Sequence, residues 1–203
     1  YSAVGGHGLM SWDIAKAAID LLQSHNLRHY EVGLFGGEPL LNKEVVMQGV
    51  PYAKQVLKDV SFMLSTNGTL LDEELIDLFS SNGIQIQISC DGGKRLQDHL
   101  RPGKHGVDSF KGVTDAVALL KNKGVSAYHA RATVTNMCPS HSELMLQLFG
   151  LGFERIGCQP VSGDPRFELS PEDVEHYCND IRALIRSGLG QHSTYISNLV
   201  SKV

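Results

Sequence analysis

The stretch Phe35-Gly36-Gly37-Glu38-Pro39-Leu40 combines residue types that could bind a small cationic ligand. It follows a strand-like run over residues 30–35 and precedes a segment that opens a helix. Two glycines at the tip of a strand let the backbone approach a ligand where any Cβ would collide. The carboxylate of Glu38 then lies where it could hold an ammonium group, such as that of an amino acid. The alternative from these residues alone is an ordinary strand-to-helix turn with a solvated glutamate.

Further polar groups follow the later predicted strands, at residues 65–69, 89–93, 131–136 and 159–160. Because ligands of parallel α/β folds bind at the carboxyl ends of the strands, we expect these groups to converge. A glutamate, an aspartate and an arginine, together with hydroxyl and amide side chains, suit a zwitterionic amino acid joined to a sugar. The chain has no Walker lysine loop and no G-x-G-x-x-G motif, which disfavours a nucleoside triphosphate or a dinucleotide.

Hydrophobic periodicity predicts that helices and strands alternate along the chain. Strands are predicted over residues 32–35, 60–65, 84–90, 127–134 and 155–161. Helices are predicted over residues 12–24, 45–57, 72–80, 110–122, 140–149 and 171–186, with a long loop over 92–108. This alternation predicts parallel β-α-β crossovers in one α/β domain, with either an open doubly wound sheet or a full or partial barrel.

Local signals refine these elements. Ser11 is expected to cap the first helix, whose apolar side chains share one face: Ile14, Ala17, Ala18, Leu21 and Leu22. Pro51 is expected to kink its helix or to mark the true start of that helix. Gly83, Gly124 and Gly152 each lie between a helix and the next strand, where a left-handed cap residue is favoured.

Composition limits the class of protein. The 203 residues suit one domain, and the formal charge of −4 argues against a surface that coats nucleic acid. No stretch approaches the roughly 18 uninterrupted apolar residues of a membrane helix, so we predict a soluble, cytoplasmic protein. Because the sequence begins at Tyr1 and stops in polar, Ser-rich sequence, we expect it to be a piece of a longer protein.

The four cysteines, Cys90, Cys138, Cys158 and Cys178, are far apart and have no C-x-x-C spacing. They cannot form a local zinc or iron-sulfur loop from sequence neighbours, and we assign them no metal. Cys90 and Cys158 lie in apolar runs and are expected to behave as small buried hydrophobes. The sequence identifies no catalytic residue.

Taken together, several elements resemble the radical S-adenosylmethionine (radical SAM) enzymes. The Gly36-Gly37-Glu38 stretch is similar to their Gly-Gly-Glu motif, and the other elements follow in the order and spacing of one subgroup: Thr66-Asn67-Gly68, Ser89-Cys90-Asp91-Gly92, Asp98-His99-Leu100-Arg101-Pro102 and Arg131-Ala132-Thr133-Val134. That subgroup comprises peptide- and protein-modifying maturases with a SPASM or twitch domain, among them the anaerobic sulfatase-maturating enzymes. Where members often have His-Asp, this chain has Gln97-Asp98, and we assign this loop no role.

The resemblance implies a partial (βα)6 TIM-like barrel with parallel strands, of which the N-terminal strand is missing. It implies a radical SAM core over residues 1–165, and over residues 166–203 the last barrel helix and the start of a connection to a missing C-terminal domain. It also implies the residues that bind S-adenosylmethionine (SAM): Gly36, Gly37 and Glu38 at its amino group, Ser89 and Asp91 at its ribose or carboxylate, Arg131 at its carboxylate, and Asn67 nearby.

Each of these residues also has a structural interpretation. Asn67 could form an ordinary turn, Asp91 could cap its own loop, and Arg131 could make a salt bridge at the end of its strand. Ser89 could be a small residue at the edge of the core.

The activity implied for the full-length protein is reductive cleavage of SAM to a 5′-deoxyadenosyl radical that modifies a peptide or protein side chain. An electron donor such as flavodoxin or ferredoxin would be needed. The C-x-x-x-C-x-x-C loop that binds the family's four-iron four-sulfur (4Fe-4S) cluster is absent, so its ligands are expected upstream, and this piece alone is expected to be inactive. The alternatives are a non-catalytic remnant, a radical SAM enzyme acting on a small metabolite, and an ordinary barrel lyase or aldolase.

Overall fold

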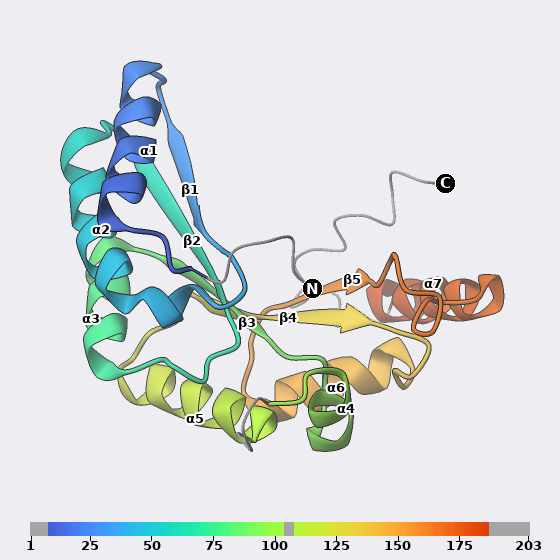
Figure 1. The fold of residues 1–203 in the computed structure, drawn as a ribbon. Coiled ribbons are helices and arrows are strands. Elements are labelled where there is room, and N and C mark those ends of the chain that lie inside the picture. Colours follow the sequence, from blue (N-terminus) through green and yellow to red (C-terminus); the bar gives the residue numbers. More distant parts are fainter. Residues whose placement is uncertain (1–7, 104–107, 187–203) are drawn as a thin grey trace. The chain divides into compact units, whose positions relative to one another are not determined.

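The structure is a computed structural model that describes residues 8–103 and 108–186. Five strands form one sheet in the order β1-β2-β3-β4-β5: β1 (Tyr30–Leu34), β2 (Val60–Thr66), β3 (Gln85–Ser89), β4 (Tyr128–Val134) and β5 (Ile156–Pro160). The helices are α1 (Trp12–Ser24), the 3-10 helix η1 (Pro39–Asn42), α2 (Lys43–Val56), α3 (Glu73–Asn82), α4 (Lys94–Leu100), α5 (Ser109–Asn122), α6 (His141–Leu151) and α7 (Pro171–Arg186) (Figure 1).

The strand pairs confirm the predicted parallel crossovers. β1 pairs with β2 in parallel, with Tyr30 opposite Val60, and β4 pairs with β5 in parallel, with Ala130 opposite Ile156. The chain divides into two compact units. The first contains Tyr1–Thr66, Leu70–Gln87 and Leu119–Ala127, and the second contains Asn67–Thr69, Ile88–Ala118 and Tyr128–Val203.

In the first unit, one face of the strands is buried and the other is not. Val60, Phe62 and Leu64 of β2 are buried, whereas the alternating Ser61 and Met63 are exposed or half-buried. Successive side chains of a strand point to opposite faces, so the buried set identifies the face that the helices cover. Figure 1 shows α1 and α2 along one side of β1 and β2. On β2 the other face carries Ser61, Met63 and Ser65, none of which is buried.

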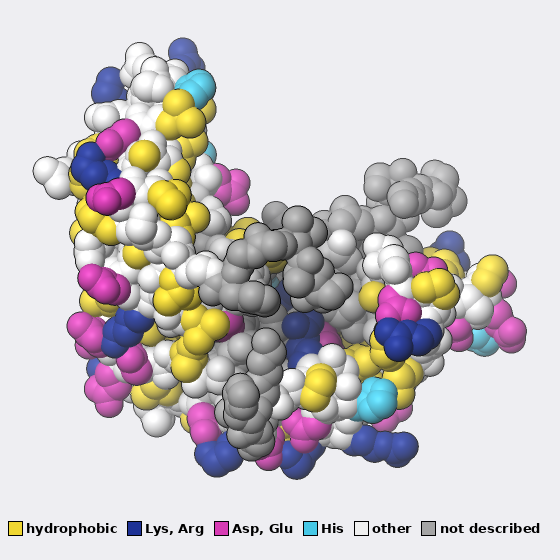
Figure 2. Space-filling model, viewed as in Figure 1, with side chains coloured by type: hydrophobic (Ala, Val, Ile, Leu, Met, Phe, Trp, Pro, Cys, Tyr) yellow, Lys and Arg dark blue, Asp and Glu magenta, His cyan; other side chains and the backbone are white. Residues whose placement is uncertain are grey.

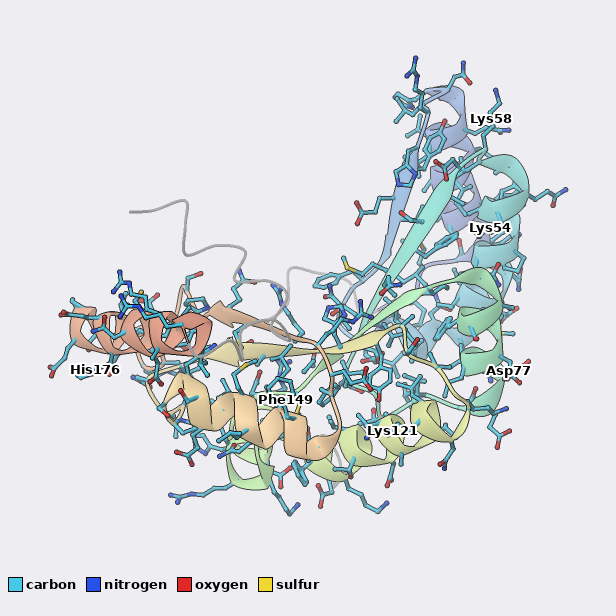
Figure 3. All side chains as sticks on the ribbon, turned by 180° about the vertical axis from the view of Figure 1, so that it is seen from behind. Lys54, Lys58, Asp77, Lys121, Phe149 and His176 are labelled. Atoms are coloured by element: carbon cyan, nitrogen blue, oxygen red, sulfur yellow. The ribbon has the colours of Figure 1, made fainter. Side chains whose placement is uncertain are left out.

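The second unit repeats this pattern. Tyr128, Ala130 and Val134 of β4 are buried, whereas Arg131 and Thr133 are half-buried and lie on the opposite face. In the first unit, charged side chains on the outer surfaces of the helices point away from the sheet, as Figure 3 shows for Lys54 of α2, Asp77 of α3 and Lys121 of α5. In each unit, therefore, one face of the strands packs against helices and the other face does not.

Every predicted helix end lies within two residues of the observed one. α1 and α7 have the predicted bounds, and Ser11 caps α1 by accepting a hydrogen bond from the backbone N–H of Ile14. The three predicted glycine caps adopt left-handed conformations, with φ of 66° at Gly83, 68° at Gly124 and 101° at Gly152. No helix in the described part of the chain is both long and apolar enough to cross a membrane.

The predicted packing face of α1 is wrong. Ile14 and Leu21 are 59% and 62% exposed, and Figure 2 shows hydrophobic side chains on the surface of this region. The helix instead packs on α2 through Trp12, whose ring meets that of Tyr52 edge to face at 5.5 Å between centroids. The apolar pattern of α1 extends over a wide arc, and the position of α2 decides which part of the arc is buried.

Two further expectations need correction. Pro51 does not start its helix, because α2 runs from Lys43 through Pro51 to Val56. The region predicted as a loop over 92–108 contains α4, which begins after Gly93 and whose end is followed by Arg101 and Pro102. A seven-residue helix between two polar loops gives too short an apolar pattern for periodicity to detect.

We predict that Gly83→Ala lowers the free energy of unfolding by about 1 kcal/mol, because Gly83 has a left-handed backbone that an L side chain strains. Gly150→Ala is the matched control: Gly150 lies inside α6, and an added Cβ there meets no atom within 4 Å. That substitution should instead raise stability by about 0.4–1 kcal/mol. Urea unfolding of the two variants measures both changes, and equal effects would contradict the cap at Gly83.

Candidate functional site

The tip of β1 carries the Gly36-Gly37-Glu38 stretch in an open conformation. The backbone of Gly36 has φ of 152°, which L side chains rarely adopt. An added Cβ at Gly36 or Gly37 meets no atom within 4 Å, so the protein itself leaves the space beside both glycines unfilled. The glycines therefore keep backbone groups accessible at the end of a strand, where a ligand can approach.

The carboxylate of Glu38 is held in a fixed orientation beside this tip. Its Oε1 accepts a hydrogen bond from the backbone N–H of Leu40 at 3.1 Å and one from Thr66 Oγ1 at 2.7 Å. Thr66 is the buried last residue of β2, and Glu38 is the cap residue of η1. The ends of β1 and β2 thus hold the half-buried carboxylate of Glu38 in one orientation, and a cation-binding site requires a carboxylate fixed in this way.

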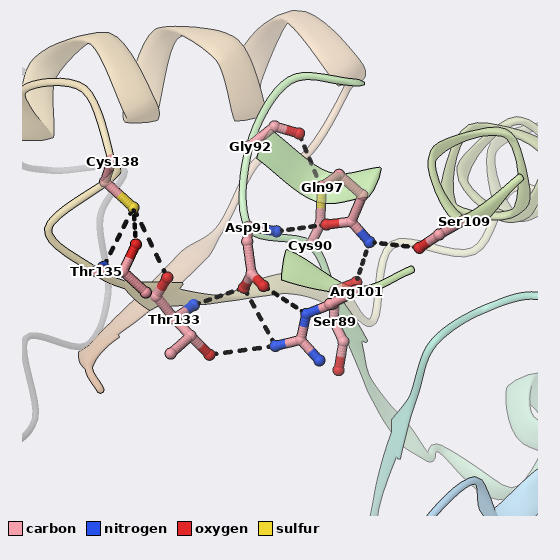
Figure 4. A network of polar contacts seen from close by, with 10 residues as sticks. All are labelled: Ser89, Cys90, Asp91, Gly92, Gln97, Arg101, Ser109, Thr133, Thr135 and Cys138. Carbon is pink, nitrogen blue, oxygen red and sulfur yellow. Dashed lines mark hydrogen bonds and ion pairs between the residues drawn. The ribbon is translucent and has the colours of Figure 1, made fainter. Parts of the chain in front are cut away.

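In the second unit, Asp91 follows β3 and is the centre of a polar network (Figure 4). Asp91 is 2% exposed. Its Oδ2 accepts a hydrogen bond from Arg101 Nε at 2.6 Å, and its Oδ1 accepts from Arg101 Nη2 at 3.1 Å and from the backbone N–H of Thr133 at 2.7 Å. These bonds join the loop after β3, the end of α4 and strand β4.

Gln97 of α4 completes the network. Its side chain is fully buried. Its Oε1 accepts a hydrogen bond from the backbone N–H of Asp91 at 2.8 Å, and its Nε2 donates to Ser109 Oγ at 3.1 Å. Its Nε2 also lies 3.5 Å from the carbonyl oxygen of Ser89. The amide therefore fixes the backbone of the loop that Ser89 and Asp91 begin.

This network bears on two predicted ligand-binding residues. Both oxygens of the Asp91 carboxylate already accept hydrogen bonds, which agrees with the interpretation that Asp91 holds its own loop. Ser89 is half-buried at the end of β3, with its backbone fixed by Gln97. A direct contact of either residue with a cofactor stays a prediction.

Arg131 lies on the polar face of β4. It is half-buried, and its Nη2 donates to Gln159 Oε1 on β5. Burial, together with the positive charges of Arg155 and Arg131, lowers the pKa of the nearby His129 to about 4. His129 is therefore neutral at neutral pH, and the positive charge at this position comes from Arg131. That charge favours binding of a carboxylate.

Asn67 forms a turn with its neighbour. Its Oδ1 accepts hydrogen bonds from the backbone N–H and the Oγ1 of Thr69, at 2.9 and 2.7 Å. This is the geometry of an Asx turn, the structural alternative for this residue. A position of Asn67 near a cofactor stays a prediction.

The cysteines are all free thiols. Burial raises the pKa of Cys90 to about 11 and that of Cys158 to about 12, so both are protonated at neutral pH. Cys90 is buried as expected, whereas Cys158 is only half-buried. Within residues 8–103 and 108–186, no group of three or more Cys, His, Asp and Glu side chains is arranged to hold a metal ion.

Sequence reasoning missed Gln97, Arg101 and Thr133. The signal was present in part, because Pro102 marks a helix end and Lys94 and Asp98 are spaced for an i,i+4 ion pair, which the structure contains at 2.8 Å. A buried glutamine that bonds to backbone atoms has no sequence signature of its own. Its partners are defined only after the chain has folded.

We predict that Arg101→Met lowers the free energy of unfolding by about 3 kcal/mol, because it leaves the buried Asp91 carboxylate without its cation. Because the side chain of Arg101 is 33% exposed, we expect a loss of stability at the lower end of the range for breaking a buried ion pair. Arg166→Met is the control, since its ion pair with Asp164 is exposed to solvent and its loss should change stability far less. Chemical denaturation that finds equal losses would contradict the role given to Arg101.

The chain is similar to proteins of known family. The sequence model of the radical SAM superfamily matches residues 2–149. A serine-type anaerobic sulfatase-maturating enzyme of Bacteroides thetaiotaomicron is 30% identical over 176 residues, which are 83% of this chain and 41% of that enzyme. An uncharacterized protein of Methanocaldococcus jannaschii, MJ0907, is 28% identical over 199 residues, which are 94% of this chain and 65% of that protein. The chain thus spans only part of the length of these relatives.

Solved structures share the fold. Native anSMEcpe with bound AdoMet and the Kp18Cys peptide has a TM-score of 0.82 and 22% identity, covering 96% of this chain and 57% of that chain. Coproporphyrinogen III oxidase (HemN) from Escherichia coli, described as a radical SAM enzyme, has a TM-score of 0.60 and 13% identity, covering 87% of this chain and 46% of that one. The fold is therefore the predicted partial barrel of parallel strands. With its family match over most of its length, this chain belongs to the radical SAM superfamily.

Proposed function

We propose that this chain is the SAM-binding part of a radical SAM enzyme that modifies a peptide or protein side chain. The observation that carries the proposal is the tip of β1, where open space beside Gly36 and Gly37 adjoins the oriented carboxylate of Glu38. An ammonium group is a donor with a positive charge, and a carboxylate and exposed backbone carbonyls are the acceptors that suit it.

The residues present fit SAM. In our proposal Glu38 and the backbone of Gly36 and Gly37 bind its ammonium group, and Thr66 keeps the Glu38 carboxylate in place. Arg131 binds the SAM carboxylate through its guanidinium, which Gln159 orients. Ser89 contacts the ribose from the end of β3, where the Gln97 amide holds its backbone.

In this assignment Asp91 acts as a positioning residue. Its carboxylate is bonded to Arg101 and to the backbone of Thr133, so it sets the distance between the loop after β3 and strand β4. It therefore supports Ser89 and Arg131 without touching the cofactor. Asn67 has the same indirect role through its turn with Thr69.

Bound together with a 4Fe-4S cluster, SAM would supply 5′-deoxyadenosyl radical chemistry for abstracting a hydrogen atom from a substrate. The contribution of this chain is to bind and orient the cofactor. Its described cysteines do not fit the cluster, because they form no group of metal ligands. We assign no step of the reaction to them.

The proposed substrate class rests on similarity to relatives. Sulfatase-maturating enzymes recur among the relatives, and a protein of the same fold has a bound peptide. By similarity to these relatives, we infer a peptide or protein substrate for the full-length protein that contains this chain. A flavodoxin or ferredoxin in the cytoplasm would be its electron donor. The second candidate, a small-metabolite substrate, is favoured by the fold shared with coproporphyrinogen III oxidase.

Glu38→Gln in the full-length protein is expected to weaken SAM binding roughly 10- to 100-fold, since it removes a charge-assisted hydrogen bond of about 1.5–3 kcal/mol. Arg131→Lys should also weaken binding, because a point charge cannot reproduce bidentate carboxylate recognition. Glu44→Gln is the control, because Glu44 lies in the first turn of α2 with a bond to Gln48. Calorimetry that finds wild-type affinity in both site variants would reject the proposed cofactor position.

The substrate class is tested separately by mass spectrometry of the full-length, cluster-loaded enzyme with SAM and peptides encoded beside its gene. A mass change in one of these peptides, which depends on SAM, is the expected result. Turnover of a free small molecule with every peptide unchanged would favour the second candidate. This outcome would leave the SAM-binding proposal intact, because the calorimetric experiment does not depend on substrate.

A further inference from the structure

The turn that follows β2 packs closely against α5 within the second unit. An added Cβ at Gly112 of α5 would lie 2.5 Å from Thr69 Cγ2, well inside the distance at which two carbon atoms attract each other. Within the same turn, a Cβ at Gly68 would lie 3.1 Å from Ala116 Cβ of α5 and 3.7 Å from Ile88 Cγ2 of β3. The turn is therefore seated against α5 and against the end of β3.

Thr69 has no easy way to move its methyl group away from Gly112. Its Oγ1 donates a hydrogen bond to Asn67 Oδ1 at 2.7 Å, and its backbone N–H donates to the same oxygen at 2.9 Å. Because rotation about χ1 moves Oγ1 and Cγ2 together, turning the methyl group away breaks the hydroxyl bond. The rotamer of Thr69 and the conformation of Asn67 are thus coupled, and the contact with Gly112 acts on both.

The close approach gives a structural reason for glycine at this position. Gly112 lies inside α5, where alanine would be the better helix former. Every other residue, however, places a Cβ at the position that is only 2.5 Å from Thr69 Cγ2. Substitution of Gly112 must therefore displace the turn or break its internal hydrogen bonds.

The turn adjoins a residue that the proposed function uses. Ser89, which we propose contacts the ribose of SAM, follows Ile88 directly in β3. Loops at the carboxyl ends of parallel strands bind the ligands of α/β folds. A displacement of about 1 Å in such a loop is enough to impair the site that it lines.

We propose that Gly112 is a positioning residue of the SAM site, where it fixes the Asn67–Thr69 turn beside the end of β3. This inference rests on the proposed function, because it concerns the same cofactor. In this proposal Gly112 acts through Thr69 and makes no contact with SAM. Its contribution is the absence of a side chain at the point where the turn meets α5.

Calorimetric titration of the full-length, cluster-loaded protein with SAM tests the proposal. Gly112→Ala should lower SAM affinity about fivefold or more, because the new Cβ displaces Thr69 and its turn. Gly150→Ala is the matched control, since Gly150 lies inside α6 of the same unit and an added Cβ there meets no atom within 4 Å. That variant should bind SAM as tightly as the wild type.

Thr69→Ser supplies the second arm of a double-mutant cycle. Serine keeps the hydroxyl that bonds to Asn67 but lacks Cγ2, and the Cβ and Cα of residue 69 lie at ordinary contact distances of 3.4 and 3.5 Å from the added Cβ. In the Thr69→Ser background, Gly112→Ala should therefore change SAM affinity less than about twofold. Wild-type affinity of Gly112→Ala, or an equal loss in both backgrounds, overturns the proposal.

The unfolding temperatures of the same variants separate positioning from a purely structural contact. Gly112→Ala should lower the unfolding temperature of the protein that has Thr69 and raise it in the Thr69→Ser background, where only the gain in helix propensity remains. A purely structural contact would produce this reversal in stability with no change in SAM affinity. That combination would contradict the positioning role.

Thr69→Val decides the question if Gly112→Ala does not fold. Valine keeps the shape of the side chain beside Gly112 but loses the hydroxyl bond to Asn67. The turn then lacks the bond that sets its conformation, and SAM affinity should fall several-fold. Wild-type affinity of Thr69→Val would overturn the proposal.

Glu38→Gln, measured in the same titration, keeps this inference apart from the proposed function. If Glu38→Gln weakens SAM binding and Gly112→Ala does not, only the positioning role fails. If Glu38→Gln and Arg131→Lys both bind SAM as the wild type does, the proposed function fails and the positioning role fails with it.

Discussion

The buried ion pair between Asp91 and Arg101 is the interaction on which the second unit depends. A carboxylate taken out of water must be paired and fully hydrogen-bonded, or it becomes costly to bury. Arg101 and the backbone of Thr133 meet this need, and in doing so they fix α4 and β4 to the loop after β3. Within the second unit, the positions of the loop after β3 and of strand β4, which carry Ser89 and Arg131, therefore depend on this ion pair.

The sheet separates stability from ligand binding by the alternation of its strands. In β4 the residues that face the helices are apolar, whereas Arg131 and Thr133 on the other face are polar. Substitutions on the binding face thus remove little apolar contact from the core. This division allows residues on the polar face of β4 to change while the apolar contacts that hold the fold are kept. The same fold is present at 22% identity in one solved relative and at 13% in another.

The sequence alone predicted much of the fold and part of the site. Strands and long helices were predicted because the periodicity of their apolar residues is strong. Gly83 and Ser11 mark helix ends through the left-handed backbone of one and the capping side chain of the other, neither of which needs a tertiary contact. The packing face of α1 could not be predicted, because it depends on where α2 and its Tyr52 lie. The partners of Asp91 could not be predicted either, since Arg101 and Thr133 meet it only in the folded chain. Motif similarity singled out Asp91, whose carboxylate joins Arg101 to the backbone of Thr133, and its contact with SAM stays a prediction.

The interleaving of the two units has a consequence for synthesis on the ribosome. The first unit includes Leu119–Ala127, and the second includes Asn67–Thr69 as well as everything after Ala127. Neither unit can be completed until the chain beyond residue 118 has emerged. At about 5–20 residues per second, the early strands wait several seconds for their partners. During that interval the strands of the first unit and the apolar side chains of α1 lack the contacts that complete their unit, so they stay exposed to other molecules.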